Sequence, residues 1–171
     1  MDMIATRERN EMEICFDAVS VNESFARVAV ASFASHLNPT MEEISDIKTA
    51  VSEAVTNAII HGYENYEGYG KYGNSRPAGS VVHPGKVRLH CLMEDGIIHI
   101  EVADQGKGIG DIARAMEPLF TTKPELGRSG MGFSFMETFM DDLLVESTPG
   151  QGTTVRMSKK LSAGAWIGGE E

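Results

Sequence analysis

Alternation of polar and apolar residues marks the strands that the sequence predicts. In residues 11–18 every second side chain is apolar, as in a half-buried strand: Met12, Ile14, Phe16 and Ala18. Four later stretches alternate in the same way and form two neighbouring pairs, 86–93 with 97–103 and 143–147 with 153–158. Asp95-Gly96 joins the first pair and favours a tight hairpin. Residues 149–152 join the second pair, so the sequence predicts antiparallel neighbours.

Apolar residues at helical spacing predict two long helices after the first strand. Residues 20–23 and 40–43 each match a capping box, with Ser20 or Thr40 as the N-cap. The first helix is expected over 21–37, and its apolar side comprises Phe25, Val28, Ala29, Ser32 and Phe33. The second is expected from 40 to about 61, and its apolar stripe comprises Ile44, Ile47, Val51, Val55, Ala58 and Ile59.

The order of elements predicts the fold class. A short helix is expected at 112–116 and another helix at 129–140. With the short helix left out, the order is β-α-α-β-β-α-β-β. Strands in adjacent pairs leave the helices only one face to cover, so we expect an α+β two-layer sandwich with a mixed, mostly antiparallel sheet. One domain is expected over 11–160, between flexible ends at 1–10 and 161–171. Within it, 62–85 reads as a flexible insertion rich in Gly and Tyr.

Composition narrows the class of protein. The 171 residues carry a formal net charge of −10, which argues against a nucleic-acid binder because phosphate affinity depends on Lys and Arg. No apolar run approaches the ~20 residues of a membrane span, and no signal peptide is recognised at the start. Cys15 and Cys91 lie far apart and are expected to be buried free thiols. We therefore expect a cytoplasmic protein without membrane contact.

The first chemical signal is a pair of polar residues on the second helix. Glu53 and Asn57 lie nearly opposite its apolar stripe and four residues apart, so their side chains meet on one face. An amide oxygen suits Mg²⁺, and a neighbouring carboxylate could accept a proton from a hydroxyl group. A solvated helix face explains the same pair without chemistry.

The second signal is the glycine-rich stretch 104–110, directly after a strand. A dinucleotide-binding loop would need G-x-G-x-x-G before a helix, whereas the sixth position here is Asp111 and a hairpin precedes the stretch. Asp104 could instead accept a hydrogen bond from the amine of adenine, while the glycines allow a flat base to approach the backbone. A turn of structural glycines is the alternative.

The third signal is the stretch 127–133, which leads into a helix. Glycines at a helix start leave backbone N–H groups free to bind phosphate oxygens. Lys123 and Arg128 could neutralise phosphate charge, so 117–129 is interpreted as a mobile lid. An ordinary loop with a helix cap fits as well. Residues 150–154 by themselves indicate only a hairpin turn.

In this order and spacing, the motifs resemble the GHKL ATP-binding superfamily over residues 11–160. Glu53, Asn57 and His61 look like its N-box, and Asp104-x-Gly106-x-Gly108 looks like its first glycine box. Gly130-Met131-Gly132-Phe133 looks like its second glycine box, and residues 152–154 look like its third. The resemblance implies the Bergerat fold with ATP and Mg²⁺ as cofactors. Its length argues against the gyrase, Hsp90 and MutL subunits of that superfamily, and we recognise no dimerising helical hairpin with the phospho-acceptor His of a sensor kinase.

The remaining group comprises stand-alone anti-sigma factors that are also protein serine/threonine kinases. Residues 22–27, 52–62 and 118–126 resemble its sporulation members. The resemblance implies Glu53 as the catalytic residue and Asn57 as the magnesium ligand. It implies that these residues bind the nucleotide: Asn57, Asp104, Gly106, Gly108, Ile109, Thr121, Thr122, Lys123, Arg128, Ser129, Gly130, Met131, Gly132, Phe133 and Thr154. His61 is interpreted as structural.

The same resemblance implies the partners. We expect a homodimer that inhibits an RNA polymerase sigma factor, sigma F of sporulation, and phosphorylates a serine of an anti-anti-sigma protein. Two alternatives stay open: an ATP-dependent sequestering protein without kinase activity, and a detached histidine-kinase catalytic domain.

Overall fold

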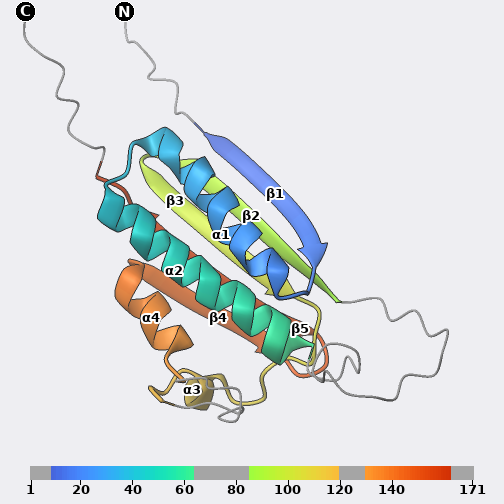
Figure 1. Cartoon of the computed structure of the whole chain (residues 1–171). Helices are drawn as coiled ribbons and strands as arrows, with labels where there is room; N and C mark the ends of the chain where they lie inside the picture. Colours follow the sequence, from blue (N-terminus) through green and yellow to red (C-terminus); the bar gives the residue numbers. More distant parts are fainter. Residues whose placement is uncertain (1–8, 64–84, 120–129, 163–171) are drawn as a thin grey trace, which may run out of the picture.

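The computed structural model of the protein describes residues 9–63, 85–119 and 130–162 (Figure 1). Along the chain the elements are β1 (Asn10–Asp17), α1 (Val21–Ala34), α2 (Met41–Asn57), β2 (Lys86–Glu94), β3 (Ile97–Asp104), α3 (Ile112–Ala115), α4 (Gly132–Phe139), β4 (Asp142–Thr148) and β5 (Gly152–Lys160). A 3₁₀ turn (Ser35–Leu37) follows α1, and a π turn (Ala58–Gly62) continues α2. Most of the lid expected at 117–129 and of the insertion expected at 62–85 lies outside the described residues.

The five strands form one sheet in the order β1-β2-β3-β5-β4. Every neighbouring pair is antiparallel, so the described sheet has no parallel pair, whereas the sequence predicted a mixed one. Helices α1, α2 and α4 lie over the same face of the sheet (Figure 1). The predicted α+β two-layer sandwich is therefore confirmed.

A row of apolar residues crosses the sheet beneath the helices. The register places Ile14, Leu89, Val102, Val155 and Val145 side by side across β1, β2, β3, β5 and β4. From above, Ile47, Val51 and Val55 of α2 are fully buried against the sheet, as the predicted stripe requires. The core therefore holds α2 in the middle of the helical layer, and the polar side of α2 faces away from the sheet centre.

The predicted hairpin between β2 and β3 is confirmed in detail. Asp95 and Gly96 have φ values of 53° and 76°, both in the left-handed region. Two such residues in succession define the tight turn whose twist matches the flanking strands. The turn fixes the register between β2 and β3, which ends on the pair Val87–Asp104 and so determines where Asp104 lies.

Only one of the two predicted capping boxes forms. Thr40 has an extended backbone, its hydroxyl accepts from the Glu43 N–H at 3.1 Å, and its own N–H donates to Glu43 at 2.7 Å. Ser20 instead has helical dihedral angles and makes no side-chain cap. Without that cap to complete, the Glu23 carboxylate accepts a hydrogen bond from Ser52 of α2. The prediction for Ser20 was therefore wrong.

The apolar side predicted for α1 was also partly wrong. Phe25 and Val28 are 53% and 59% exposed, whereas Phe33 is buried as expected. The buried side of α1 consists of Ala26, Val30, Phe33 and Ala34. Alanines let helices pack closely, so α1 turns its small residues toward α2 and the core. Cys91 is buried as expected, but Cys15 is exposed because it points to the open face of β1.

Candidate nucleotide-binding site

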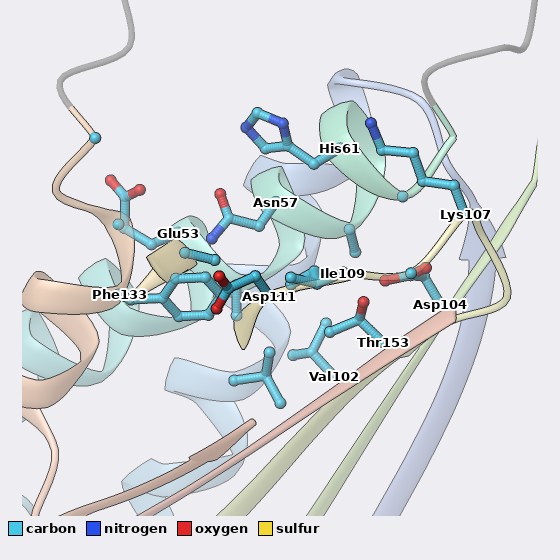
Figure 2. A pocket seen from close by; sticks show the side chains of 18 of the residues that line it. Glu53, Asn57, His61, Val102, Asp104, Lys107, Ile109, Asp111, Phe133 and Thr153 are labelled. Carbon is cyan, nitrogen blue, oxygen red and sulfur yellow. The ribbon is translucent and has the colours of Figure 1, made fainter. Parts of the chain in front are cut away.

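The polar side of α2 supplies one wall of the site. Glu53, Asn57 and His61 follow one another at successive turns and project into the same space (Figure 2). On its other side this helix is anchored by Val55, which is fully buried in the core. The helix widens into the π turn directly after Asn57, a distortion that often accompanies functional sites. The core thus determines which side of α2 faces the cavity.

Asp104 ends β3 and is the buried charged residue of the described chain, only 8% exposed. Its carboxylate accepts hydrogen bonds from the backbone N–H of Gly106, at 2.8 Å, and of Thr153. Burial raises the pKa of Asp104, and these two N–H donors partly oppose that rise. A buried carboxylate with acceptor sites remaining can bind a ligand N–H group strongly.

Close backbone contacts explain the glycines that follow Asp104. A Cβ at Gly106 would lie 1.9 Å from the carbonyl oxygen of Gly62, and one at Gly108 would lie 2.2 Å from that of Thr148. Gly108 also has a φ of 71°. The Ile109 N–H donates to the Ser147 hydroxyl at 2.8 Å. The turn is therefore packed against the π turn on one side and the β4–β5 hairpin on the other.

The start of α4 approaches the polar pair on α2. A Cβ at Gly132 would lie 3.1 Å from Oε2 of Glu53 and 3.2 Å from Nδ2 of Asn57. No described side chain caps this helix start. The first N–H groups of a helix lack partners within the helix, so this end can bind anionic oxygens.

These segments enclose one cavity of about 470 Å³, within the range of small-molecule sites. Nine predicted residues line it: Glu53, Asn57, Asp104, Gly108, Ile109, Gly130, Met131, Gly132 and Phe133. Figure 2 shows Asp104 and Thr153 at one end, below the helix that carries Asn57. The structure therefore brings together the three motifs on which the sequence prediction depends.

Two predicted residues lie elsewhere. Gly106 does not line the cavity but supplies an N–H group to Asp104. Thr153, which pairs with Asp104 across β3 and β5, lines the cavity in place of the predicted Thr154. Successive strand residues point to opposite faces, so Thr154 shares the open face of the sheet with Arg156. Thr121, Thr122, Lys123, Arg128 and Ser129 lie outside the described residues.

The cavity also contains polar residues that sequence reasoning did not assign to it: His61, Lys107, Asp111 and Arg114. His61 was interpreted as structural, although its spacing from Asn57 already placed it on the same side of α2. Lys107 lies between the two glycines of the first box, and the direction of its side chain depends on the backbone path of the turn, which the sequence does not show. Asp111 caps α3, accepting from the Arg114 N–H at 3.0 Å.

No described helix is long and apolar enough to cross a membrane. No group of three or more His, Cys, Asp or Glu side chains in the described parts could hold a metal ion.

Comparison with known proteins assigns the chain to a family. Residues 17–159 match the family described as "Histidine kinase-like ATPase domain". That description implies that the chain binds ATP. Because the match covers both walls of the cavity, it coincides with the site built from α2, the Asp104 turn and α4.

Curated relatives and a solved structure agree with this assignment. The chain is 53% identical to "Anti-sigma F factor" of Bacillus subtilis over 90% of its length and 94% of the relative. It is 54% identical to the protein of that name from Clostridium botulinum, over 90% and 96%. The crystal structure of the RsbU and RsbW domains of a Mycobacterium tuberculosis protein shares the fold, with a TM-score of 0.58 and 20% identity over 89% of this chain and 32% of that one. The chain therefore belongs to the histidine kinase-like ATPase domain family and, within it, to the family of the anti-sigma F factors.

Proposed function

We propose that the protein inhibits sigma factor F and uses ATP with Mg²⁺ to phosphorylate a serine of an anti-anti-sigma protein. The observation that carries this proposal is the single cavity shared by Glu53, Asn57, Asp104 and Gly132. Phosphoryl transfer depends mainly on positioning and on neutralising charge, so a small set of well-placed groups is sufficient.

Asp104 is proposed to recognise the base. Two backbone N–H groups hold its carboxylate, which leaves acceptor sites for the exocyclic amine of adenine. Gly108 and Ile109 line the same cavity, where they are proposed to face the base. Thr153 adds a hydroxyl group beside Asp104, in the role that the sequence prediction gave to Thr154.

Asn57 and the start of α4 are proposed to hold the phosphates and their metal. An amide oxygen and phosphate oxygens are the hard ligands that Mg²⁺ takes while keeping several waters. This fits a cavity in which no described cluster of carboxylates could bind a metal alone. When bound, Mg²⁺ supplies charge neutralisation at the phosphates. The uncapped N–H groups from Gly132 onward donate to phosphate oxygens.

Glu53 is proposed as the general base. Its Oε2 and the Nδ2 of Asn57 both face the position that a Cβ of Gly132 would occupy, so the two side chains meet where the phosphates approach α4. A carboxylate here can orient a serine hydroxyl and accept its proton as the oxygen attacks. The predicted roles of Thr121, Thr122, Lys123, Arg128 and Ser129 remain predictions for the lid.

The partners are proposed from the relatives. Proteins named anti-sigma F factor match 90% of the chain at 53% identity, which supports sigma F as the inhibited partner. The net charge of −10 suits a basic partner surface, since charge complementarity aids association. The homodimer and the anti-anti-sigma substrate belong to the same proposal.

Labelled ATP tests the kinase proposal. Incubation with Mg²⁺ and the anti-anti-sigma protein should label a serine, giving a product stable to acid and labile to base. Glu53→Gln should abolish labelling while ATP binding persists. Glu42→Gln, the same change at an exposed position of α2, should label normally. A product labile to acid and stable to base would instead indicate a histidine kinase.

Absence of label from the folded, ATP-binding protein would favour the sequestering protein without transfer. Binding of sigma F is tested separately, by comparing its capture in ATP and in ADP. The proposal expects sigma F to be captured, and captured better with ATP. If neither nucleotide supports capture of purified sigma F, the assignment of this partner is wrong.

A further inference from the structure

We infer that Tyr63 is a positioning residue of the nucleotide site, because its hydroxyl group holds the turn that carries Asp104. The hydroxyl donates to the carbonyl oxygen of Lys86 at 2.6 Å and accepts from the backbone N–H of Gln105 at 2.9 Å. It therefore joins the start of β2 to the residue directly after Asp104. The inference rests on the proposed role of Asp104 in binding adenine.

The sheet register shows what these two hydrogen bonds replace. The last pair between β2 and β3 is Val87 with Asp104, so Lys86 and Gln105 would form the next pair of the ladder. Instead, the Tyr63 hydroxyl stands between the carbonyl group of one and the N–H group of the other. The Tyr63 side chain thus takes the place of the next backbone hydrogen bond between β2 and β3, at the point where β3 ends and the glycine-rich turn begins.

The Tyr63 ring is held firmly enough to act in this way. It packs against the hydrophobic core, and its atoms lie 2.1–2.4 Å from the place that a Cβ of Gly85 would take. Gly85 in turn accepts a hydrogen bond from the Ala18 N–H at 2.7 Å, which fixes it to the chain after β1. Only a residue without a side chain at 85 leaves space for the ring.

The residue before Tyr63 holds the other end of the same turn. The carbonyl oxygen of Gly62 accepts from the Lys107 N–H at 2.8 Å, and a Cβ at Gly62 would lie 2.8 Å from Oδ1 of Asp104. Gly62 and Tyr63 therefore secure both ends of the turn from Asp104 to Lys107. Inside that turn the Gly106 N–H donates to the Asp104 carboxylate, so a shift of the turn also moves the carboxylate.

Tyr63→Phe removes the hydroxyl group and keeps the ring, so it tests positioning without emptying the core. Loss of a bridging hydroxyl at a partly exposed site should weaken ATP binding about fivefold. Purine riboside triphosphate lacks the amine that Asp104 would bind, and its affinity should change less than twofold. Gln105→Ala is the matched control, because it alters a side chain but keeps the N–H group, and it should bind both nucleotides like the parent protein.

Amide hydrogen exchange provides a second readout in the protein without nucleotide. The Gln105 N–H should exchange faster in Tyr63→Phe than in the parent protein, while its counterpart in Gln105→Ala should remain protected. Unchanged ATP affinity, or equal weakening of both nucleotides, would overturn the positioning role of Tyr63. If the parent protein itself binds the two nucleotides equally, the proposed contact of Asp104 with adenine is wrong, and the inference falls with it.

Discussion

Replacing Asp104 by Asn tests the recognition of adenine with almost no change in shape. The carboxylate already accepts from two backbone N–H groups, those of Gly106 and Thr153, and the adenine amine would be a third donor. A carboxylate offers about four acceptor sites, whereas an amide offers one oxygen and two N–H donors. In Asp104→Asn, at least one of the three donors therefore loses its acceptor.

The expected loss follows from the charge of the acceptor. A hydrogen bond to a charged group contributes roughly 1.5–3 kcal/mol, which corresponds to about ten- to a hundredfold in affinity. Isothermal titration calorimetry should show ATP binding weakened by that factor. Purine riboside triphosphate, which lacks the amine, should bind the variant and the parent within about threefold of each other.

A stability control separates this effect from unfolding. The variant leaves one backbone donor poorly matched, at a cost of about 1 kcal/mol, so its melting temperature should stay within about 4 °C of the parent. ATP affinity that equals the parent's, in a variant that melts within this range, would refute the assignment of Asp104 to the adenine amine.

Three further predictions concern the start of α4, the pH dependence of stability and the two thiols. Gly132→Ala places a methyl group 3.2 Å from Nδ2 of Asn57, so serine labelling should fall at least about tenfold while adenosine binding changes little, as measured by kinase assay and calorimetry. Burial raises the pKa of Asp104 in the folded protein above that in the unfolded chain. Ionising this carboxylate therefore destabilises the parent protein, by nothing below the unfolded pKa and by the full amount once the pH has risen through the folded pKa. Over this pH range the free energy of unfolding of Asp104→Asn, measured by urea melts at several pH values, should rise relative to that of the parent. Burial raises the pKa of Cys91 to about 12, so iodoacetamide at pH 8 should label only exposed Cys15 in the folded protein and both thiols after denaturation, as counted by mass spectrometry.

Local patterns were sufficient to predict most elements of this fold. The period of apolar residues gave the α2 face that packs on the sheet, with Ile47 and Val51 fully buried. Asp95-Gly96 predicted its hairpin because the two residues adopt left-handed dihedral angles at low cost. In these cases the decisive interactions lie within a few residues along the chain, so the sequence contains the whole signal.

The predictions were wrong where contacts between segments far apart in the sequence determine the direction of a side chain. Thr153 and Thr154 are chemically identical, and only the pairing of Thr153 with Asp104 determines which one faces the cavity. The rotation of α1, which exposes Phe25, depends on its contact with α2. Tyr63 falls within the stretch predicted to be a flexible insertion, and its function depends on contacts with β2 and with the turn after β3.

The candidate site was predictable as a set of motifs but not as a geometry. Nine of the site residues that the resemblance implied line the cavity, because each motif spans only a few residues and can be recognised without the fold. The sequence could not show that the start of α4 lies against Glu53 and Asn57, since that contact joins segments 75 residues or more apart and depends on the packing of α4 beside α2.

A crystal structure with Mg²⁺ and a non-hydrolysable ATP analogue would show whether α2, the turn after Asp104 and the start of α4 form one nucleotide site. The adenine amine is expected within hydrogen-bond distance of the Asp104 carboxylate, and the phosphates are expected between Asn57 and the first N–H groups of α4. An analogue bound outside this cavity, or bound in it with the base at Glu53 and the phosphates at Asp104, would show that the proposed site is wrong.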